Sequence, residues 1–410
     1  MRRAKLIVIG GGASGMMAAI SAAKLGAEVT ILEHKDKLGK KILSTGNGKC
    51  NFTNEDQNIS HYHARELEFV QTVLRQFDYN KTLDFFMNLG IIPKKKNGYY
   101  YPNSNQASSI LDVLLLEINR LGIKVITDCE IKTIDERKGF VIYTNVGRFN
   151  ADRIIISTGS KAASHTGSDG SGYDIAKEYG HRIRPVLPAL VQLQCRGKFF
   201  KKLAGVRSDA KISLYVDGNM TASDTGELQL TDYGISGIPV FQISRFASIA
   251  LYEKKSTEVL IDFLPDMDET EVKGYLISRL MNKDIQDINL EDALIGMLNK
   301  KLIYVIIKEA GLDPVGKNSD ITLDDIDALI RNIKAFKVLI SASNSFDKAQ
   351  VCTGGVDCGD IDAESLESKI VPGLYFAGEL LDVDGDCGGY NLQWAWSSGY
   401  VAGIHAAKEI

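Results

Sequence analysis

A glycine-rich run near the N-terminus has the residue types and spacing of a phosphate-binding turn. Gly10 to Gly15 (GGGASG) follows the apolar stretch KLIVI and precedes the alanine-rich stretch MMAAISAAKL. This order predicts a strand, a tight turn and a helix, whose first backbone N–H groups and positive dipole end bind an anion. Gly10 permits the turn, Gly12 lets the backbone approach a pyrophosphate, and Gly15 lets helix and strand pack closely.

Glu33 closes the next predicted strand, Glu28 to Glu33 (EVTILE), which completes a βαβ unit with the glycine turn. A carboxylate at this place would accept hydrogen bonds from ribose hydroxyls, and it disfavours a 2′-phosphate. The sequence therefore predicts a dinucleotide ligand, FAD or NAD. The alternative, a glycine turn in an unrelated α/β fold, is disfavoured because strand, helix and carboxylate all stand where the motif requires them.

The C-terminal region favours FAD over NAD. Gly373 to Glu379 (GLYFAGE) reads as a strand and a turn, and the glycines of DGDCGGYNLQ lead into a final helix over 391–408. A helix N-terminus that follows glycines is a second anion site. We expect the backbone N–H groups of Gly389, Asn391 and Leu392 to face the N1–C2=O edge of an isoalloxazine ring, where they would stabilise reduced flavin.

Other segments could add contacts to the same ligand. Gly378 and Asp386 would flank a pyrophosphate and ribityl chain. The run IIISTG over 154–159 is a second strand with a glycine turn, and it reads equally well as a plain core strand. The segment 39–54 (GKKILSTGNGKCNFTN) has backbone and amide donors suited to phosphates and flavin, although Asn-Gly turns of a surface loop are the alternative.

No side chain identifies itself as a catalytic acid or base. The histidines at 61, 63, 165 and 181 stand in ordinary surroundings and are left unassigned. The six cysteines lack paired or metal-ligand spacing, so we expect no metal, and we interpret Cys50, Cys352 and Cys387 as small packing residues. Tyr101, in the cluster YYYPNS, could wall a substrate pocket or belong to a sheet edge.

Composition points to a globular protein that binds a small molecule. The 410 residues carry 48 basic and 52 acidic side chains, a formal charge of −4, which suggests neither nucleic acid nor a stable membrane association. No segment has the length and apolarity of a signal peptide core or a membrane span. Scattered cysteines suit a reducing compartment, so we expect a cytoplasmic location.

The order of helical and strand-like segments along the chain predicts three structural domains. Helical patterns over 61–89 and 107–121 alternate with strand patterns over 124–134, 140–144 and 153–157. Strand-like stretches follow Pro188, and an acidic helical region follows Asp268. We expect an α/β dinucleotide-binding domain over 1–187 plus 345–410, a β-rich substrate domain over 188–265 plus about 334–344, and a helical subdomain over 266–333.

These blocks resemble a family of bacterial NAD(P)/FAD-dependent oxidoreductases that includes an aminoacetone oxidase and a bile-acid reductase. The segments that show the resemblance are spread over nearly the whole chain: IGGGASGMMAA, KKILSTGNGKCNFTN, LTDYGISGIPVFQIS and GLYFAGELLDVDGDCGGYNLQWAWSSGYVAG. The resemblance implies a Rossmann-like FAD-binding domain of the glutathione-reductase type, interrupted by a β-barrel-like domain and a small helical domain. In one departure, relatives often have more glycines and an arginine before Cys50, which leaves Lys49 as the candidate cation.

The resemblance also implies a set of site residues. Those expected to contact FAD are Gly10, Gly12, Ala13, Ser14, Gly15, Glu33, His34, Lys40, Thr45, Gly46, Asn47, Cys50, Asn51, Ile131, Thr158, Gly159, Gly378, Glu379, Asp386, Gly389, Asn391 and Leu392. NAD(P)H would bind transiently, because no second G-x-G-x-x-G is evident.

Three functions remain open at this level. The first is hydride transfer through flavin N5 between an organic substrate and NAD(P)H, such as reduction of an enone in an unsaturated oxo-bile acid. The second is an aminoacetone-like amine oxidase that uses O₂ and releases hydrogen peroxide. The third is a flavin-binding regulatory or RNA-modifying protein, which the net acidity disfavours.

Overall fold

The computed structural model describes residues 3–408 and divides the chain into two compact units. The first unit comprises Met1–Leu187 and Gln350–Ile410, and the second comprises Pro188–Ala349. Within the described residues, no helix is long and apolar enough to cross a membrane. The further division of the second unit into a β-rich and a helical domain stays a prediction.

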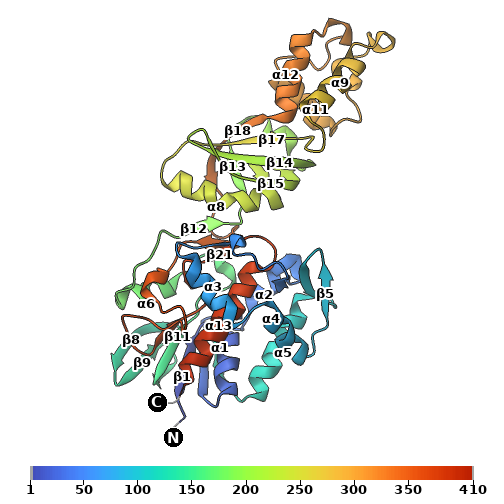
Figure 1. The fold of residues 1–410 in the computed structure, drawn as a ribbon. Helices are drawn as coiled ribbons and strands as arrows, with labels where there is room; N and C mark the ends of the chain where they lie inside the picture. The colour runs from blue at the N-terminus through green and yellow to red at the C-terminus, as the bar shows by residue number, and fades with distance from the viewer. Residues whose placement is uncertain (1–2, 409–410) are drawn as a thin grey trace. The chain divides into compact units, whose positions relative to one another are not determined.

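A parallel sheet forms the centre of the first unit (Figure 1). Its strand order is β20-β11-β1-β2-β7, with bounds β20 (Leu374–Phe376), β11 (Arg153–Ile156), β1 (Lys5–Ile9), β2 (Glu28–Leu32) and β7 (Lys124–Ile126). The paired runs KLIVI and RIII are almost fully buried, as expected for a parallel sheet covered on both faces. Because the strands are parallel, the residues after β1, β2, β11 and β20 meet at one sheet edge.

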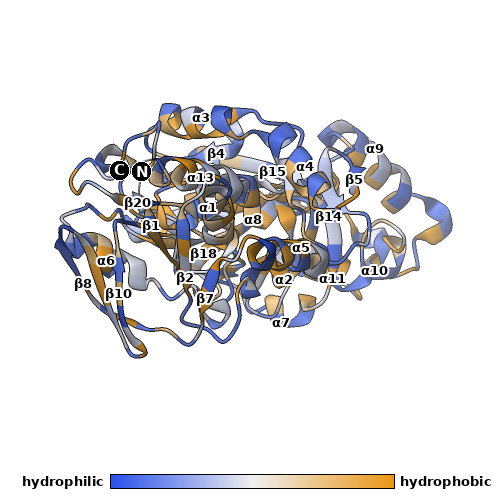
Figure 2. Cartoon of the chain, turned by 90° about the horizontal axis from the view of Figure 1, so that it is seen from below, coloured by the Kyte–Doolittle hydropathy of each residue, from blue (hydrophilic) through white to orange (hydrophobic). Residues whose placement is uncertain are grey.

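Helices and small antiparallel sheets surround this centre. The helices are α1 (Ala13–Lys24), α2 (Lys40–Ser44), α3 (Leu67–Gln76), α4 (Tyr79–Asn88), α5 (Ala107–Arg120), α6 (Ser171–Glu178) and α13 (Tyr390–Ala406). The other strands are β3 (Thr53–Asn54), β4 (Tyr62–His63), β5 (Pro93–Lys96), β6 (Tyr99–Pro102), β8 (Ile131–Arg137), β9 (Gly139–Thr144), β10 (Gly147–Ala151), β19 (Val351–Thr353) and β21 (Asp384–Gly385). In Figure 2, hydrophobic colour runs along β1 and β20, as their burial requires.

Two predicted elements are each divided in two. The helical pattern over 61–89 was wrong at its start, where Tyr62–His63 form β4, and the rest becomes α3 and α4, because the Asp78 side chain accepts a hydrogen bond from the Lys81 backbone N–H and starts a new helix. The strand pattern over 124–134 becomes β7 in the parallel sheet and β8 in an antiparallel sheet. Between them Asp128 has a positive φ of 50°, which turns the chain.

Helices α1 and α13 lie side by side and run in the same direction (Figure 1). A Cβ atom on Gly399 would collide with the Ser14 carbonyl oxygen, and one on Gly403 with the Ala18 carbonyl oxygen. Only glycine permits this close approach. Gly399 of α13 lies at the same height as Ser14 of α1. The N-terminus of α13 therefore projects about eight residues, or roughly 12 Å, past the N-terminus of α1.

The second unit contains a closed barrel, which confirms the predicted inserted barrel. Its strand order is β13-β16-β15-β14-β17-β18, with bounds β13 (Leu193–Cys195), β14 (Arg207–Val216), β15 (Asn219–Leu230), β16 (Gly234–Ser236), β17 (Thr257–Asp262) and β18 (Phe336–Ser343). The helices are α7 (Phe200–Leu203), α8 (Ile238–Tyr252), α9 (Glu269–Leu280), α10 (Leu290–Ala293), α11 (Lys300–Glu309) and α12 (Leu323–Lys334). One hydrophobic core runs from the barrel into these last helices. The strand β12 (Leu187–Ala189) contains the boundary between the units.

Candidate dinucleotide-binding site

The three glycines of the N-terminal motif have different surroundings. A Cβ on Gly10, which has φ +101°, would lie 2.5 Å from the Ser157 carbonyl oxygen, and one on Gly15 would collide with the Gly10 carbonyl oxygen. The lack of a side chain at these two glycines therefore lets the helix, the turn and the strand pack closely. Gly12 caps α1 without a side-chain hydrogen bond, and no heavy atom lies within 4 Å of the place its Cβ would occupy. Open space therefore faces the helix N-terminus at Gly12.

Glu33 is buried and points back at the glycine turn. Its Oε2 accepts a hydrogen bond of 2.8 Å from the Gly11 N–H, and its Oε1 accepts one of 2.8 Å from the Lys35 N–H. The ring of His34 lies 3.6 Å from the same carboxylate. Backbone donors thus fix the carboxylate beside the turn, as the ribose-binding prediction requires.

The second glycine turn lies against the first. Thr158 follows β11, and its Cα would be 3.0 Å from a Cβ on Gly10. The Thr158 hydroxyl is buried and has no hydrogen-bond partner among the described residues. Gly159 has φ +73° and approaches the Ser168 hydroxyl. The segment 154–159 thus combines a core strand with a turn that lies against the first glycine turn, and its contacts with a cofactor stay predictions.

Gly378 and Glu379 contact the start of α1 and its neighbours. A Cβ on Gly378 would collide with the Ser14 side chain. Glu379 accepts hydrogen bonds from Lys41 Nζ at 2.7 Å, from the Ser160 hydroxyl at 2.7 Å and from the Cys352 N–H at 3.1 Å. This carboxylate is satisfied within the chain, so we expect it to position the surrounding loops.

The loop over 45–54 is a strained segment beside α13. Gly46, Asn47 and Cys50 all have positive φ, at 55°, 53° and 56°. Burial raises the pKa of the Cys50 thiol to about 12, which disfavours a thiolate nucleophile, and its roles in packing and in cofactor contact stay predictions. The Asn51 side chain is buried, and its Oδ1 accepts no hydrogen bond from any described residue. That oxygen lies 3.0 Å from the place a Cβ on Gly389 would occupy.

The N-terminus of α13 is fixed from several sides. Gly389 caps the helix at φ +96°. The Asn391 side chain accepts from the Gly385 N–H at 2.9 Å and donates to the Gly385 carbonyl at 2.7 Å. The indole N–H of Trp394 donates to the Gly378 carbonyl, and that of Trp396 donates to the Phe52 carbonyl. The two glycine-rich C-terminal segments and the 45–54 loop therefore converge on this helix end.

Gln393 ties the 45–54 loop to α13 through a fully buried network. It accepts from the Thr53 hydroxyl at 2.6 Å and donates to the Phe77 carbonyl and the Ser397 hydroxyl. We predict that Gln393→Met lowers the free energy of unfolding by about 2 kcal/mol, because buried polar groups lose their partners. Chemical denaturation followed by tryptophan fluorescence measures this. Gln71→Met, on the exposed side of α3, is the matched control, and equal effects of both variants would contradict the role of the network.

For some predicted site residues, the contacts within the chain give no sign of a cofactor site. Lys40 forms an ion pair with Asp36, four residues earlier. Ile131 begins β8 and packs partly buried against the core of the first unit. The Thr45 hydroxyl donates to the Ile42 carbonyl, and Tyr101 on β6 lies 3.7 Å from the place a Cβ on Gly46 would occupy. Cofactor contacts of these residues stay predictions.

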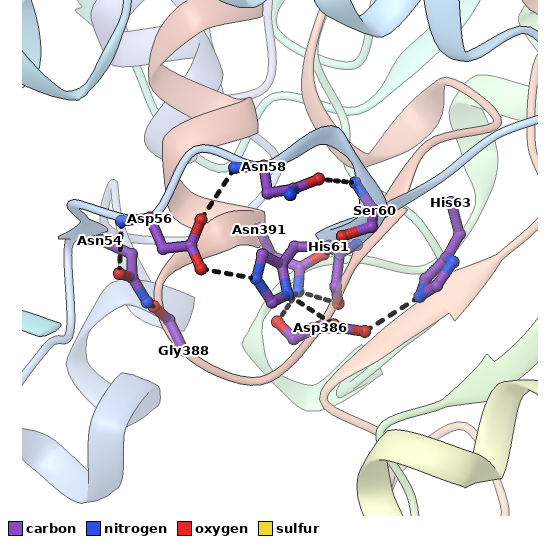
Figure 3. Close-up of polar contacts among 10 residues, drawn as sticks. Asn54, Asp56, Asn58, Ser60, His61, His63, Asp386, Gly388 and Asn391 are labelled. Carbon is purple, nitrogen blue, oxygen red and sulfur yellow. Dashed lines mark hydrogen bonds and ion pairs between the residues drawn. The ribbon is translucent and has the colours of Figure 1, made fainter. Parts of the chain in front are cut away.

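Sequence reasoning predicted Asp386 as a site residue but missed the two histidines beside it, near the N-terminus of α13. Asp386 accepts hydrogen bonds from both His61 and His63, which the sequence left unassigned (Figure 3). Strand alternation in His-Tyr-His would not have found the pair, because His63 lies on β4 whereas His61 ends the preceding 3-10 helix, Ile59–His61. Within the described part of the chain, this cluster included, no three His, Cys, Asp or Glu side chains are grouped so that they could hold a metal ion.

Comparison with known proteins agrees with this geometry. The family model described as HI0933-like protein Rossmann domain matches residues 4–405. A 3-dehydro-bile acid delta(4,6)-reductase of Clostridium scindens is 46% identical over 404 residues, 98% of each chain. A ribosomal RNA dihydrouridine synthase of Haemophilus influenzae is 30% identical over 410 residues, also 98% of each chain. The solved 3-ketosteroid delta1-dehydrogenase of Sterolibacterium denitrificans shares the fold, with a TM-score of 0.51 at 12% identity, covering 98% of this chain and 99% of that one.

Fold and site together define the class of an FAD-dependent oxidoreductase with a Rossmann-like core. These findings confirm the predicted fold class and the prediction of FAD, while NAD(P)H as a co-substrate stays a prediction. Within that class, the chain belongs to the HI0933-like Rossmann family.

Proposed function

We propose that this chain reduces a carbon–carbon double bond conjugated with a carbonyl in a steroid-like small molecule, with electrons from NADH or NADPH. The observation that carries the proposal is the 46% identity, over 98% of both chains, to a 3-dehydro-bile acid delta(4,6)-reductase. The alignment covers nearly all of both chains, so it includes both units of this one. A delta(4,6) 3-dehydro compound is a conjugated enone, so enone reduction is the expected chemistry.

The residues present fit an FAD. Open space faces the N-terminus of α1 at Gly12, and the buried oxygens of Thr158 and Asn51 have no partner among the described residues. Two parallel helices offer their N-termini about 12 Å apart along a common direction. One end suits a pyrophosphate and the other suits the polar edge of a ring further along the same molecule. When bound, FAD supplies hydride transfer.

Each part of the chain has a task in this scheme. Glu33, fixed by two backbone N–H groups, holds the ribose. The first turn of α1 holds the phosphates through backbone donors and the helix dipole. The first turn of α13 places backbone N–H groups and positive potential beside the ring edge that becomes negative on reduction. Asn51, buried next to Gly389, adds a side-chain amide there.

A second candidate is the reduction of uridine in RNA. Two ribosomal RNA dihydrouridine synthases are 30% and 29% identical to this chain over 98% of its length. A dihydrouridine is a uridine with one ring double bond reduced, so the two candidates share their chemistry and differ in substrate. Exposed Lys94, Lys95 and Lys96 on β5 could contact phosphates, whereas the net charge of −4 disfavours RNA. The absence of nucleic-acid binding stays a prediction, as does the cytoplasmic location.

Anaerobic stopped-flow absorbance tests the proposal. The FAD-reconstituted protein is mixed with NADH or NADPH, and the reduced protein then meets a 3-oxo-Δ4,6 bile acid, ribosomal RNA without dihydrouridine, or aerated buffer. We expect bleaching of the visible flavin band by one nicotinamide and rapid reoxidation by the dienone. Reoxidation by RNA alone would support the second candidate. No bleaching by either nicotinamide, with fast turnover of an amine in air, would support the amine-oxidase alternative and contradict the proposal.

A further inference from the structure

The imidazole ring of His61 lies between two carboxylates (Figure 3). Its Nδ1 lies 3.0 Å from Asp386 Oδ2, and its Nε2 lies 3.1 Å from Asp56 Oδ2. A neutral imidazole has one N–H group and one lone pair, so it can donate a hydrogen bond to only one of these carboxylates. Only the doubly protonated, cationic ring satisfies both of them.

The surroundings of the ring favour its charged form. Burial acts to lower the pKa of His61, but the hydrogen bonds to Asp386 and Asp56 outweigh it, so the pKa is raised from its ordinary value. A hydrogen bond from the Asn58 N–H, and then the one from His61, lower the pKa of Asp56. Only 20% of the Asp386 side chain is exposed, against 59% for Asp56, so water screens the pair with Asp386 less.

Two further titratable groups belong to this arrangement. The Tyr390 ring of α13 stacks on the His61 ring, with centroids 4.5 Å apart and planes inclined by 17°. Burial raises the pKa of the Tyr390 hydroxyl, which therefore stays protonated and neutral. His63 on β4 reaches the other oxygen of Asp386, with its Nε2 at 2.9 Å. The charge at Asp386 thus depends on both histidines, and the charge at Asp56 depends on His61.

Hydrogen bonds attach this arrangement to the first turn of α13. The Asp386 N–H donates to the His61 carbonyl at 2.9 Å, and Asn391 Nδ2 donates to the Asp386 carbonyl at 3.3 Å. Asn54 Nδ2 donates to the carbonyl of Gly388, at 3.0 Å, in the glycine turn that leads into the helix. The charge of His61 therefore acts next to the helix end that is proposed to hold the polar edge of the FAD ring.

We propose that His61 is a positioning residue of the FAD site and acts in its doubly protonated form, so that FAD binds more weakly as the pH rises and the ring loses one proton. The cation offsets the negative charge of Asp386 and holds Asp56 against the same ring. Without it, one carboxylate faces a lone pair, and the local charge becomes more negative by one. An anionic cofactor then meets a less favourable potential at the start of α13. His61 itself needs no contact with FAD for this effect.

Proton linkage gives the direction of the effect. Because folding raises the pKa of His61, the stabilisation by its charge is complete below the ordinary histidine pKa and is lost as the pH rises through the raised value. If FAD favours the cationic form, bound FAD must in turn raise the pKa of His61 further, because coupling between two binding events is reciprocal. The inference rests on the proposed placement of FAD at α13 and does not depend on the substrate.

The test is a titration of FAD into the full-length apoprotein, followed by flavin fluorescence, between about pH 6 and 9. We expect the wild-type Kd to rise about tenfold over this range, and the exposed control His165→Gln to show the same rise. His61→Gln should bind weakly throughout, with a Kd that changes less than about twofold. His61→Arg should bind tightly throughout, because a guanidinium donates to both carboxylates and stacks on an aromatic ring at every pH in the range.

Two results would overturn the inference: a wild-type Kd that does not change with pH, or a rise of equal size in His61→Gln. Circular dichroism of the apoproteins shows whether each variant is folded. A purely structural role of His61 would weaken binding in His61→Gln without removing the pH dependence, and this too would overturn it. Any rise that remains in His61→Gln at a smaller size belongs to other groups.

Nitrogen NMR of the imidazole rings in the apoprotein supplies a readout that needs no cofactor. We expect the doubly protonated ring of His61 to persist to higher pH than an ordinary histidine, and Asp386→Asn to remove most of this difference. An unshifted titration in the wild-type chain contradicts the inference. If FAD binds with the expected pH dependence but the dienone does not reoxidise the reduced enzyme, only the proposed function fails. If turnover is found and the Kd is independent of pH, only the inference fails.

Discussion

Gly12→Val is expected to leave the fold intact and to weaken FAD binding at least about 100-fold, or about 2.7 kcal/mol. The backbone of Gly12 is extended, with φ −78° and ψ −169°, which valine adopts without strain. Apart from its chain neighbours, no heavy atom lies within 4 Å of its Cβ position, so open space surrounds the point from which the new side chain extends. It does fill the space in front of the α1 N-terminus, where the pyrophosphate must approach the backbone. Titration of FAD into the apoprotein, followed by flavin fluorescence, gives the Kd.

Two other glycines make this test specific. Gly15→Ala places a Cβ into the Gly10 carbonyl oxygen, so it should lower stability and FAD affinity together. Gly274→Ala, exposed in the middle of α9, should stabilise the chain by about 0.5–1 kcal/mol without changing the Kd for FAD. Circular dichroism of the three apoproteins separates folding from binding. A Gly12→Val protein with wild-type affinity would contradict the placement of the pyrophosphate.

The parts of the site that the sequence predicted are those in which the chemistry is local. The turn at Gly10–Gly15, the carboxylate at Glu33 and the glycines before α13 each work through neighbours in the chain, so their spacing carries the information. The strands of the inserted domain were predictable for a similar reason, because alternating residues separated by glycines mark strands, whereas a barrel was implied by the family resemblance. The hydrophobic pattern did not predict the break between two helices at Asp78, because one capping side chain there interrupts a continuous helical periodicity.

The contacts that the sequence could not supply join residues far apart in the chain. His61 and Asp386 are separated by 325 positions, and Lys41 and Glu379 by 338. The sequence shows the sign of each charge, but it does not show which basic side chain meets which carboxylate. Those pairs depend on the pairing of β4 with β21 and on the close contact of α1 with α13. Lys40 pairs with Asp36, which lies four positions earlier and before α2, and its contact with the cofactor stays a prediction.

In the second unit, Lys334→Met is expected to lower the free energy of unfolding by about 3–5 kcal/mol. Lys334 ends α12, and only 9% of its side chain is exposed. Its Nζ pairs with Asp262 Oδ2 at 2.7 Å and donates to the carbonyls of Leu264 and Met267. Methionine keeps the length of the side chain but leaves a largely buried carboxylate and two carbonyl oxygens without the ammonium. The ion pair therefore ties the helical segment to the barrel strand β17.

Neighbouring residues supply the controls for this prediction. Lys337 on β18 pairs with Glu258 but is 58% exposed, so Lys337→Met should cost no more than about 1 kcal/mol. Adding Asp262→Leu to Lys334→Met should restore much of the lost stability, because the unpaired carboxylate is removed. Both tryptophans lie in α13 of the first unit, so far-UV circular dichroism should report the loss in denaturant while tryptophan fluorescence keeps its wild-type midpoint. Equal losses for Lys334→Met and Lys337→Met would show that the burial of the pair does not determine its contribution.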